Sequence, residues 1–271
     1  MEIALKFDPN VKEVIVVEKF NKKFFDILKL SKFLKNLNLN KLYIFKCSLR
    51  FYIAGKLAKI TTSSYPFYKK INLHLVREAH DFTLKELNLK KCSTETRLYL
   101  NENILKEVKE KLPLERKKIL IAPSSSGPTT MWKTEYFINL MKKLDDKFNC
   151  FFIIAVDASE REQKIGNEII KSFSKEKTMI LSNKTISQLM PIISCCNISI
   201  CNDTSFQHLS CQLNVPTLIL RFDTPSAYSS YSKLQHSIFP NGYEDVNHNT
   251  RANPNLITVE MVFNKVLDLI N

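Results

Sequence analysis

The chain has 271 residues, of which 44% are hydrophobic and 25% charged, and these values are typical of a globular protein that buries a core. No apolar run approaches the roughly 20 residues that cross a bilayer, and the N-terminus lacks the basic and then apolar pattern of a signal peptide. Both features argue against a membrane-spanning or secreted protein, so we expect a cytoplasmic one.

The formal net charge of +13 has two interpretations. It favours an anionic partner, such as a diphosphate ligand or an acidic membrane surface, or it reflects lysines spread over solvated helix faces. No arginine-rich or aromatic-interleaved tract is present, so we expect no nucleic-acid partner. The chain has only four glycines, which argues against a glycine-rich phosphate loop.

The seven cysteines are odd in number and form no CxxC pair. Most lie in apolar runs, so we expect buried free thiols in a reducing compartment. Their spacing matches no zinc site, and we expect neither a metal nor a cofactor.

In the first half, apolar runs alternate with helix-period stretches. Strands are expected at residues 13–17, 41–46 and 58–62, and helices at 23–37, 48–58 and 75–87, with Ser48 as an N-cap. The stretch 88–116 is polar and irregular, with a charged helix near 103–111. We expect the domain boundary there.

In the second half, short apolar strands alternate with amphipathic helices, which is typical of a parallel sheet covered on both faces. We expect loops in residues 223–256. Strands are expected at 118–122, 150–156, 178–181, 198–201 and 217–222, and helices at 135–147, 160–173, 186–195, 204–213 and 258–269. Such sheets bind ligands beyond the carboxyl ends of their strands.

The first candidate site is the loop that follows strand 198–201. A helix begins there at once, and its free N–H groups and partial positive charge suit a phosphate. Thr204 and Ser205 could add hydroxyl donors, and His208 lies one turn along on the same face. The alternative is simple capping, with Asp203 as N-cap and a capping box between Thr204 and Gln207.

Two more loops follow strands at the same edge. Residues 122–133 offer the hydroxyls of Ser125, Ser126 and Thr130 and the charge of Lys133, although a surface turn has the same composition. In residues 156–160, a carboxylate could accept hydrogen bonds from ribose hydroxyls, or the acids could serve as a helix cap.

The order of these loops resembles the C-terminal domain of glycosyltransferase family 9, the ADP-heptose:lipopolysaccharide heptosyltransferases. The family's Asp-Thr-Gly-x-x-His-Leu-Ala is similar to Asp203-Thr204-Ser205-Phe206-Gln207-His208-Leu209-Ser210, and its loop ending in Lys-Arg-Trp-Pro is similar to 123–132. Its Pro-Thr and apolar strand resembles 216–220. Thr130 stands where the family has a lysine, and Ser205 where it has a glycine.

The first half resembles the family from Phe7-Asp8-Pro9 onward, including Ser48-Leu49-Arg50 and the helix from His80. The family's opening strand and the Gly-Asp loop that carries its general base have no counterpart. We therefore assign no catalytic residue.

The resemblance implies an α/β, GT-B-like fold with two Rossmann-like parallel-sheet domains, an incomplete N-terminal one at 1–112 and a nucleotide-sugar-binding one at 113–271. It implies inverting, metal-independent transfer of heptose or a related sugar from an ADP-sugar to a glycolipid or saccharide acceptor of the lipopolysaccharide core, with contact at the inner face of the membrane. The donor would be held by Ser125, Ser126, Thr130, Lys133, Glu160, Asp203, Thr204, Ser205 and His208. The alternative is a degenerate relative that only binds nucleotide or needs a separate N-terminal piece.

Overall fold

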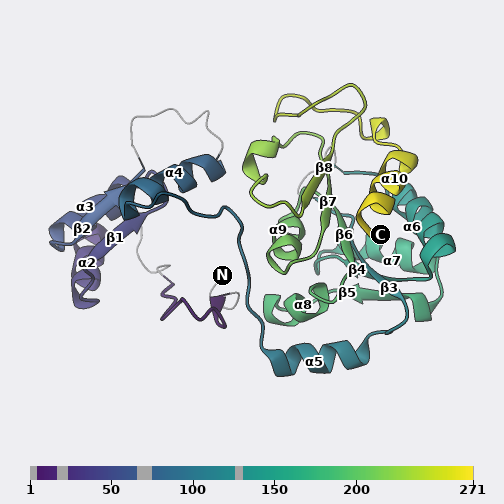
Figure 1. Ribbon diagram of the computed structural model, residues 1–271, viewed down its shortest axis with the longest axis horizontal. Helices are drawn as coiled ribbons and strands as arrows, with labels where there is room; N and C mark the ends of the chain where they lie inside the picture. Colours follow the sequence, from purple (N-terminus) through teal and green to yellow (C-terminus); the bar gives the residue numbers. More distant parts are fainter. Residues whose placement is uncertain (1–4, 17–23, 66–74, 126–130, 271) are drawn as a thin grey trace. The chain divides into compact units, whose positions relative to one another are not determined.

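The computed structural model describes residues 5–16, 24–65, 75–125 and 131–270 (Figure 1). The chain divides into two compact units, a smaller one formed by residues 13–93 and a larger one formed by 1–12 and 94–271. Helix α5 (Glu102–Lys111) belongs to the larger unit. The predicted division into domains at residue 112 stays a prediction.

The smaller unit holds a short parallel sheet packed against helices. Strands β1 and β2 pair in parallel, with Lys41 opposite Thr61. Its elements are α2 (Phe24–Asn36), β1 (Lys41–Ile44), α3 (Leu49–Leu57), β2 (Thr61–Ser64) and α4 (Leu75–Leu87). Its buried core consists of Leu30, Leu34, Ala54, Ala58 and Ile60.

Two predictions in this unit are wrong. Residues 13–16 form no strand, because no described segment pairs with them, and Ile15 and Val16 remain exposed. The third strand begins at Thr61 instead of residue 58, because Ala58 caps helix α3 and Lys59 turns the chain with a positive φ of 61°. Ser48 is the predicted N-cap residue, but its side chain makes no capping hydrogen bond.

The larger unit holds a six-stranded sheet in the order β5-β4-β3-β6-β7-β8, in which each neighbouring pair is parallel. The strands are β3 (Lys117–Ala122), β4 (Cys150–Ala155), β5 (Thr178–Leu181), β6 (Ile198–Asn202), β7 (Thr217–Leu220) and β8 (Gln235–Ile238). The first five were predicted within two residues at each end. Residues 235–238 were predicted as loop, since the sequence Gln-His-Ser-Ile is too polar to indicate a strand. They pair with β7 through their backbone.

Helices cover both faces of this sheet (Figure 1). Side chains alternate along each strand, so Ile119 and Ile121 join one buried cluster while Leu120 and Ala122 join the other. Helices α6, α7 and α10 pack on the first cluster, and α8 and α9 contribute to the second. Their bounds are α6 (Thr134–Phe148), α7 (Glu160–Lys171), α8 (Ile186–Ile193), α9 (Ser205–Gln212) and α10 (Val259–Ile270). Strands buried on both faces explain the continuous apolar runs in the sequence.

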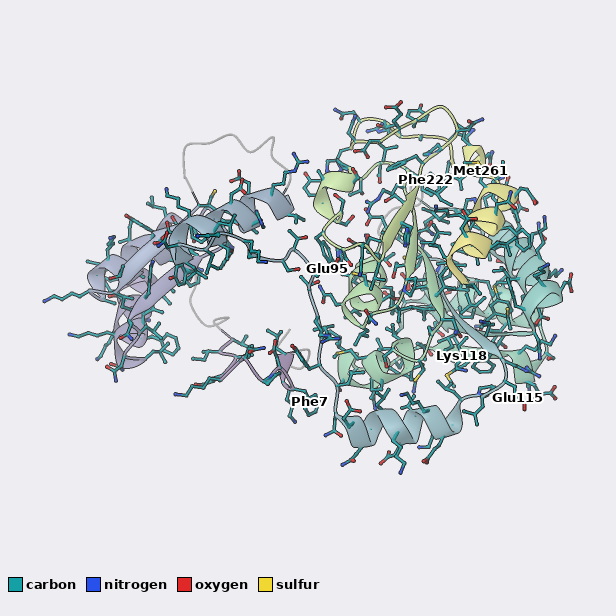
Figure 2. The ribbon with its side chains drawn as sticks, in the orientation of Figure 1. Phe7, Glu95, Glu115, Lys118, Phe222 and Met261 are labelled. Carbon is teal, nitrogen blue, oxygen red and sulfur yellow. The ribbon has the colours of Figure 1, made fainter. Side chains whose placement is uncertain are left out.

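Short 3-10 turns connect these elements at η2 (Lys175–Lys177), η3 (Ser226–Tyr228) and η4 (Pro254–Leu256). Phe222, labelled in Figure 2, follows β7 and is buried in the same cluster as the helix α10 residues. Within the described residues, no helix combines the length and the apolar character that crossing a membrane requires.

The close approach of α3 to β2 depends on Gly55. A Cβ there would overlap Thr62 Oγ1 and lie 2.9 Å from Leu42 Cδ2. We expect Gly55→Ala to lower the free energy of unfolding by roughly 1–3 kcal/mol, because overpacking outweighs the higher helix propensity of alanine. Urea unfolding measures this change. The Thr62→Ala background should recover much of the loss, and a stabilising Gly55→Ala would contradict the packing described.

Candidate functional site at the carboxyl edge of the larger sheet

The larger unit has a cavity of about 590 Å³ beyond the carboxyl ends of its strands. Parallel pairing brings the ends of β3, β4, β6 and β7 to this edge, which is where sheets of this class bind ligands. The residues that line the cavity come from the loops after these four strands and from the first turns of the helices that follow. They are Ser124, Ser125, Asp157, Glu162, Asp203, Thr204, Ser205, Phe206, His208 and Thr224.

The buried side chain of Asn202, at the end of β6, fixes both ends of the loop after β3. Its Nδ2 donates to the carbonyl of Pro123 at 2.6 Å, and its Oδ1 accepts from the backbone N–H of Trp132 at 3.1 Å. The indole Nε1 of Trp132 donates to the carbonyl of Ile257 at 2.8 Å, so Trp132 anchors the end of this loop. The positions of Ser126 and Thr130 lie outside the described residues.

The first turn of α9 differs from the predicted cap. Thr204, not Asp203, is the N-cap, and its hydroxyl accepts from the N–H of Phe206 at 3.3 Å. The predicted capping box is absent because the side chain of Gln207 points elsewhere: its amide N–H donates to Asp203 Oδ1, and its Oε1 accepts from Arg221. The carboxylate of Asp203 is therefore tied into a side-chain network beside the helix start.

Arg221 is the centre of this network, and the sequence reasoning missed it. It follows β7 directly and is 1% exposed. Its Nη2 donates to Gln207 Oε1 at 3.3 Å, and its Nη1 lies 3.9 Å from Asp203 Oδ2. Burial lowers the pKa of Arg221, and the neighbouring Asp203 carboxylate opposes this shift; a guanidinium remains charged in proteins.

The same guanidinium holds the segment after β7. Its Nε donates to Ser237 Oγ at 2.7 Å, its Nη1 donates to the carbonyl of Thr224 at 3.3 Å, and its Nη2 also donates to the hydroxyl of Ser229. Since Thr224 and Asp203 both line the cavity, one buried cation connects two of its walls. The only signal in the sequence was an arginine at the end of an otherwise apolar strand.

His208 is positioned by Tyr231. Its Nδ1 lies 2.8 Å from the hydroxyl of Tyr231, and the two rings stack with centroids 5.7 Å apart. Burial lowers the pKa of His208, although Asp203 opposes this shift. The imidazole is therefore neutral at neutral pH. Cys211 Sγ also lies 3.1 Å from the Tyr231 hydroxyl.

The segment around Tyr231 is fixed in turn by Thr94 and Glu95. The hydroxyl of Thr94 donates to the carbonyl of Tyr231 at 2.8 Å, and the N–H of Lys233 donates to Glu95 Oε1 at 2.9 Å. Figure 2 labels Glu95 on the extended segment that leads to α5. Tyr231 gave no signal in the sequence, because it lies 23 residues from His208 in an irregular stretch.

In the third loop, Asp157 and Glu162 line the cavity, and Glu160 does not. The N–H of Asp157 donates to Glu162 Oε2 at 2.6 Å, and hydrogen bonds from Ser159 lower the pKa of Asp157. The predicted Glu160 is 86% exposed at its side chain and pairs with Lys164.

Lys133 also lies away from the cavity lining. Its ammonium pairs with Glu135 at 3.5 Å, and it occupies the N-cap position of α6. Of the nine residues predicted for the site, the structure brings together Ser125, Asp203, Thr204, Ser205 and His208.

The doubly wound sheet with a cavity at its carboxyl edge defines an α/β protein with a Rossmann-like fold. A sequence profile of glycosyltransferase family 9 (heptosyltransferase) matches residues 54–249. The chain belongs to this family, as the sequence motifs predicted.

Solved structures agree with the fold. The chain is similar to ADP-heptose LPS heptosyltransferase II of E. coli, with a TM-score of 0.71 and 19% identity over 99% of this chain and 86% of that one. It is also similar to a family 9 glycosyl transferase of Veillonella parvula (TM-score 0.76, 15% identity, 99% and 85% coverage). E. coli heptosyltransferase WaaC, solved with ADP-2-deoxy-2-fluoro heptose, gives a TM-score of 0.71 at 14% identity, with 98% and 86% coverage. No curated protein sequence matches the chain. The predicted GT-B-like α/β fold with parallel sheets is confirmed.

The Arg221 network generates a stability prediction. Arg221→Lys should lower the free energy of unfolding by roughly 2–4 kcal/mol, because a lysine ammonium cannot donate to all the buried acceptors that the planar guanidinium reaches. Denaturant unfolding measures this. Arg161→Lys, at an exposed arginine of α7, is the matched control and should change stability little. If Arg221→Lys leaves the free energy of unfolding nearly unchanged, the Arg221 network contributes little to stability.

The lowered pKa of His208 generates a pH prediction. A histidine whose pKa is lowered on folding contributes stability that is present above its unfolded pKa of about 6.5 and is lost as the pH falls from there toward the folded pKa. The stability advantage of the wild type over His208→Gln should therefore shrink below about pH 6.5. Urea unfolding of both proteins between neutral and mildly acidic pH measures this, and an advantage that grows on acidification would show that the folded state prefers the imidazolium.

Proposed function

We propose that the chain transfers heptose or a related sugar from an ADP-sugar to a glycolipid or saccharide acceptor of the lipopolysaccharide-core type, with inversion and without a metal. The observation that carries this proposal is the cavity at the start of α9, where hydroxyls, the positive end of the helix and the imidazole of His208 converge. Family membership supports the reaction class. The related E. coli structures contain ADP or an ADP-heptose analogue, which supports the donor class.

In this proposal, the diphosphate lies at the N-terminus of α9. The helix start supplies partial positive charge, and Ser125 and Ser205 supply hydroxyls from two sides. These donors stabilise the charge that develops on the diphosphate as the sugar leaves. Ser126 and Thr130 belong to the loop that begins at this wall, and we propose them as further contacts.

His208 acts in this proposal as a neutral hydrogen-bond donor. If the Tyr231 hydroxyl donates to Nδ1, the proton of the ring resides on Nε2, which is then available to a diphosphate or ribose oxygen. The carboxylates of Asp157 and Glu162 accept hydrogen bonds from ribose hydroxyls. The cytoplasmic location and the contact with the inner face of the membrane remain proposals.

The decisive measurement is calorimetric binding of ADP and of an ADP-sugar to the full chain. We expect saturable binding that His208→Ala and Asp203→Ala weaken about tenfold or more, because each removes a polar group that lines the cavity. The matched controls are His248→Ala and Asp268→Ala, which remove an exposed histidine and an exposed aspartate elsewhere.

Three outcomes separate the alternatives. Binding together with sugar transfer to a core acceptor supports the proposal. Binding without transfer to any core acceptor would identify a relative that only binds nucleotide. If neither ADP nor an ADP-sugar binds, the assignment of the cavity as a donor site is wrong.

A further inference from the structure

The positive charge of the chain is concentrated in the smaller unit. Its 81 residues, 13–93, contain 17 lysines and arginines and 6 acidic residues, a net charge of +11. The other 190 residues contain 23 basic and 21 acidic residues, a net charge of +2. A general preference for lysine would affect both units alike. The asymmetry therefore favours an anionic partner of the smaller unit over lysines that are merely spread across solvated faces.

The smaller unit also exposes many large apolar side chains. Those of Val16, Phe25, Phe45, Leu49 and Leu57 are more than half exposed. Others at least a third exposed are Ile15, Leu28, Leu39, Leu75, Leu87 and Leu89. A basic unit that also presents aromatic and aliphatic side chains has the two features that bind a protein to an anionic membrane surface.

Helix α2 combines both features on one face. Its inner face packs Leu30 and Leu34 into the core of the unit. Its outer face presents Phe25, 72% exposed, and Leu28, 48% exposed. The outer face continues with Lys29, Lys32 and Lys35, all exposed.

These five positions recur at spacings of three and four residues, so they form a single stripe along the helix. Asp26 lies off the stripe, is 9% exposed, and reaches Lys29 only at 4.0 Å. The stripe therefore keeps a positive charge.

We propose that the outer face of α2 docks the protein on an anionic phospholipid bilayer. Phe25 and Leu28 would enter the boundary between headgroups and acyl chains, while the three lysines contact lipid phosphates. The same face lacks the features of nucleic-acid recognition, because its one aromatic side chain gives no series of stacking platforms. The docking does not depend on the donor chemistry of the larger unit.

Flotation of the full chain with vesicles tests this proposal. We expect binding to vesicles that contain phosphatidylglycerol and little binding to pure phosphatidylcholine, with a marked loss at high salt. The triple variant Lys29→Gln/Lys32→Gln/Lys35→Gln should weaken binding about a hundredfold, since each lysine near an anionic surface contributes roughly fivefold. Phe25→Ser/Leu28→Ser should also weaken it, with less dependence on salt.

The matched controls make the same kinds of substitution in the larger unit. Lys106→Gln/Lys171→Gln/Lys184→Gln removes three exposed lysines, and Leu114→Ser/Leu256→Ser removes two exposed leucines. Neither control should change vesicle binding. Circular dichroism and ADP binding on the same preparations show that the variants fold and report on the cavity separately.

Four results would overturn the proposal. These are no binding to anionic vesicles, equal binding to neutral ones, unchanged binding of the α2 variants, or salt-sensitive binding of an oligonucleotide without binding to vesicles. A failure of ADP binding would leave the docking result intact and would count only against the donor site.

Discussion

The parallel pairing of β3, β4, β6 and β7 is the constraint on which the site depends. Each backbone ladder fixes the direction of its strand, so the four following loops must lie at the same edge. Residues separated by up to 100 positions in the chain, Ser124 and Thr224 among them, then line one cavity. The apolar character of these strands on both faces makes this arrangement the one that buries the core.

Buried polar side chains refine the geometry that the sheet creates. Asn202 satisfies a carbonyl and an N–H at the two ends of the loop after β3, and Arg221 connects the start of α9 to the segment after β7. Both are almost fully buried, so leaving their partners unpaired would cost free energy. They position the groups around the cavity, while Ser125, Ser205 and His208 face it.

The two units have different electrostatic characters. The larger one is nearly neutral, and its cavity contains both carboxylates and hydrogen-bond donors. The smaller one carries most of the excess charge together with exposed apolar side chains. The proposed donor site in the larger unit and the proposed docking face of α2 would together suit an enzyme that joins a water-soluble sugar donor to an acceptor held in a lipid layer.

The sequence by itself determined most helices and strands, the parallel sheet, the family and the loop that contains Asp203 and His208. Periodicity and loop order are local properties, and the chain displays them directly. Only the tertiary structure decided that Thr204 caps α9, that Glu162 replaces Glu160 at the cavity, and that β8 completes the sheet. The same holds for Arg221 and Tyr231, whose roles depend on partners 14 and 23 residues away. Side-chain direction and long-range hydrogen bonding are set by packing, and residue spacing in the sequence does not specify them.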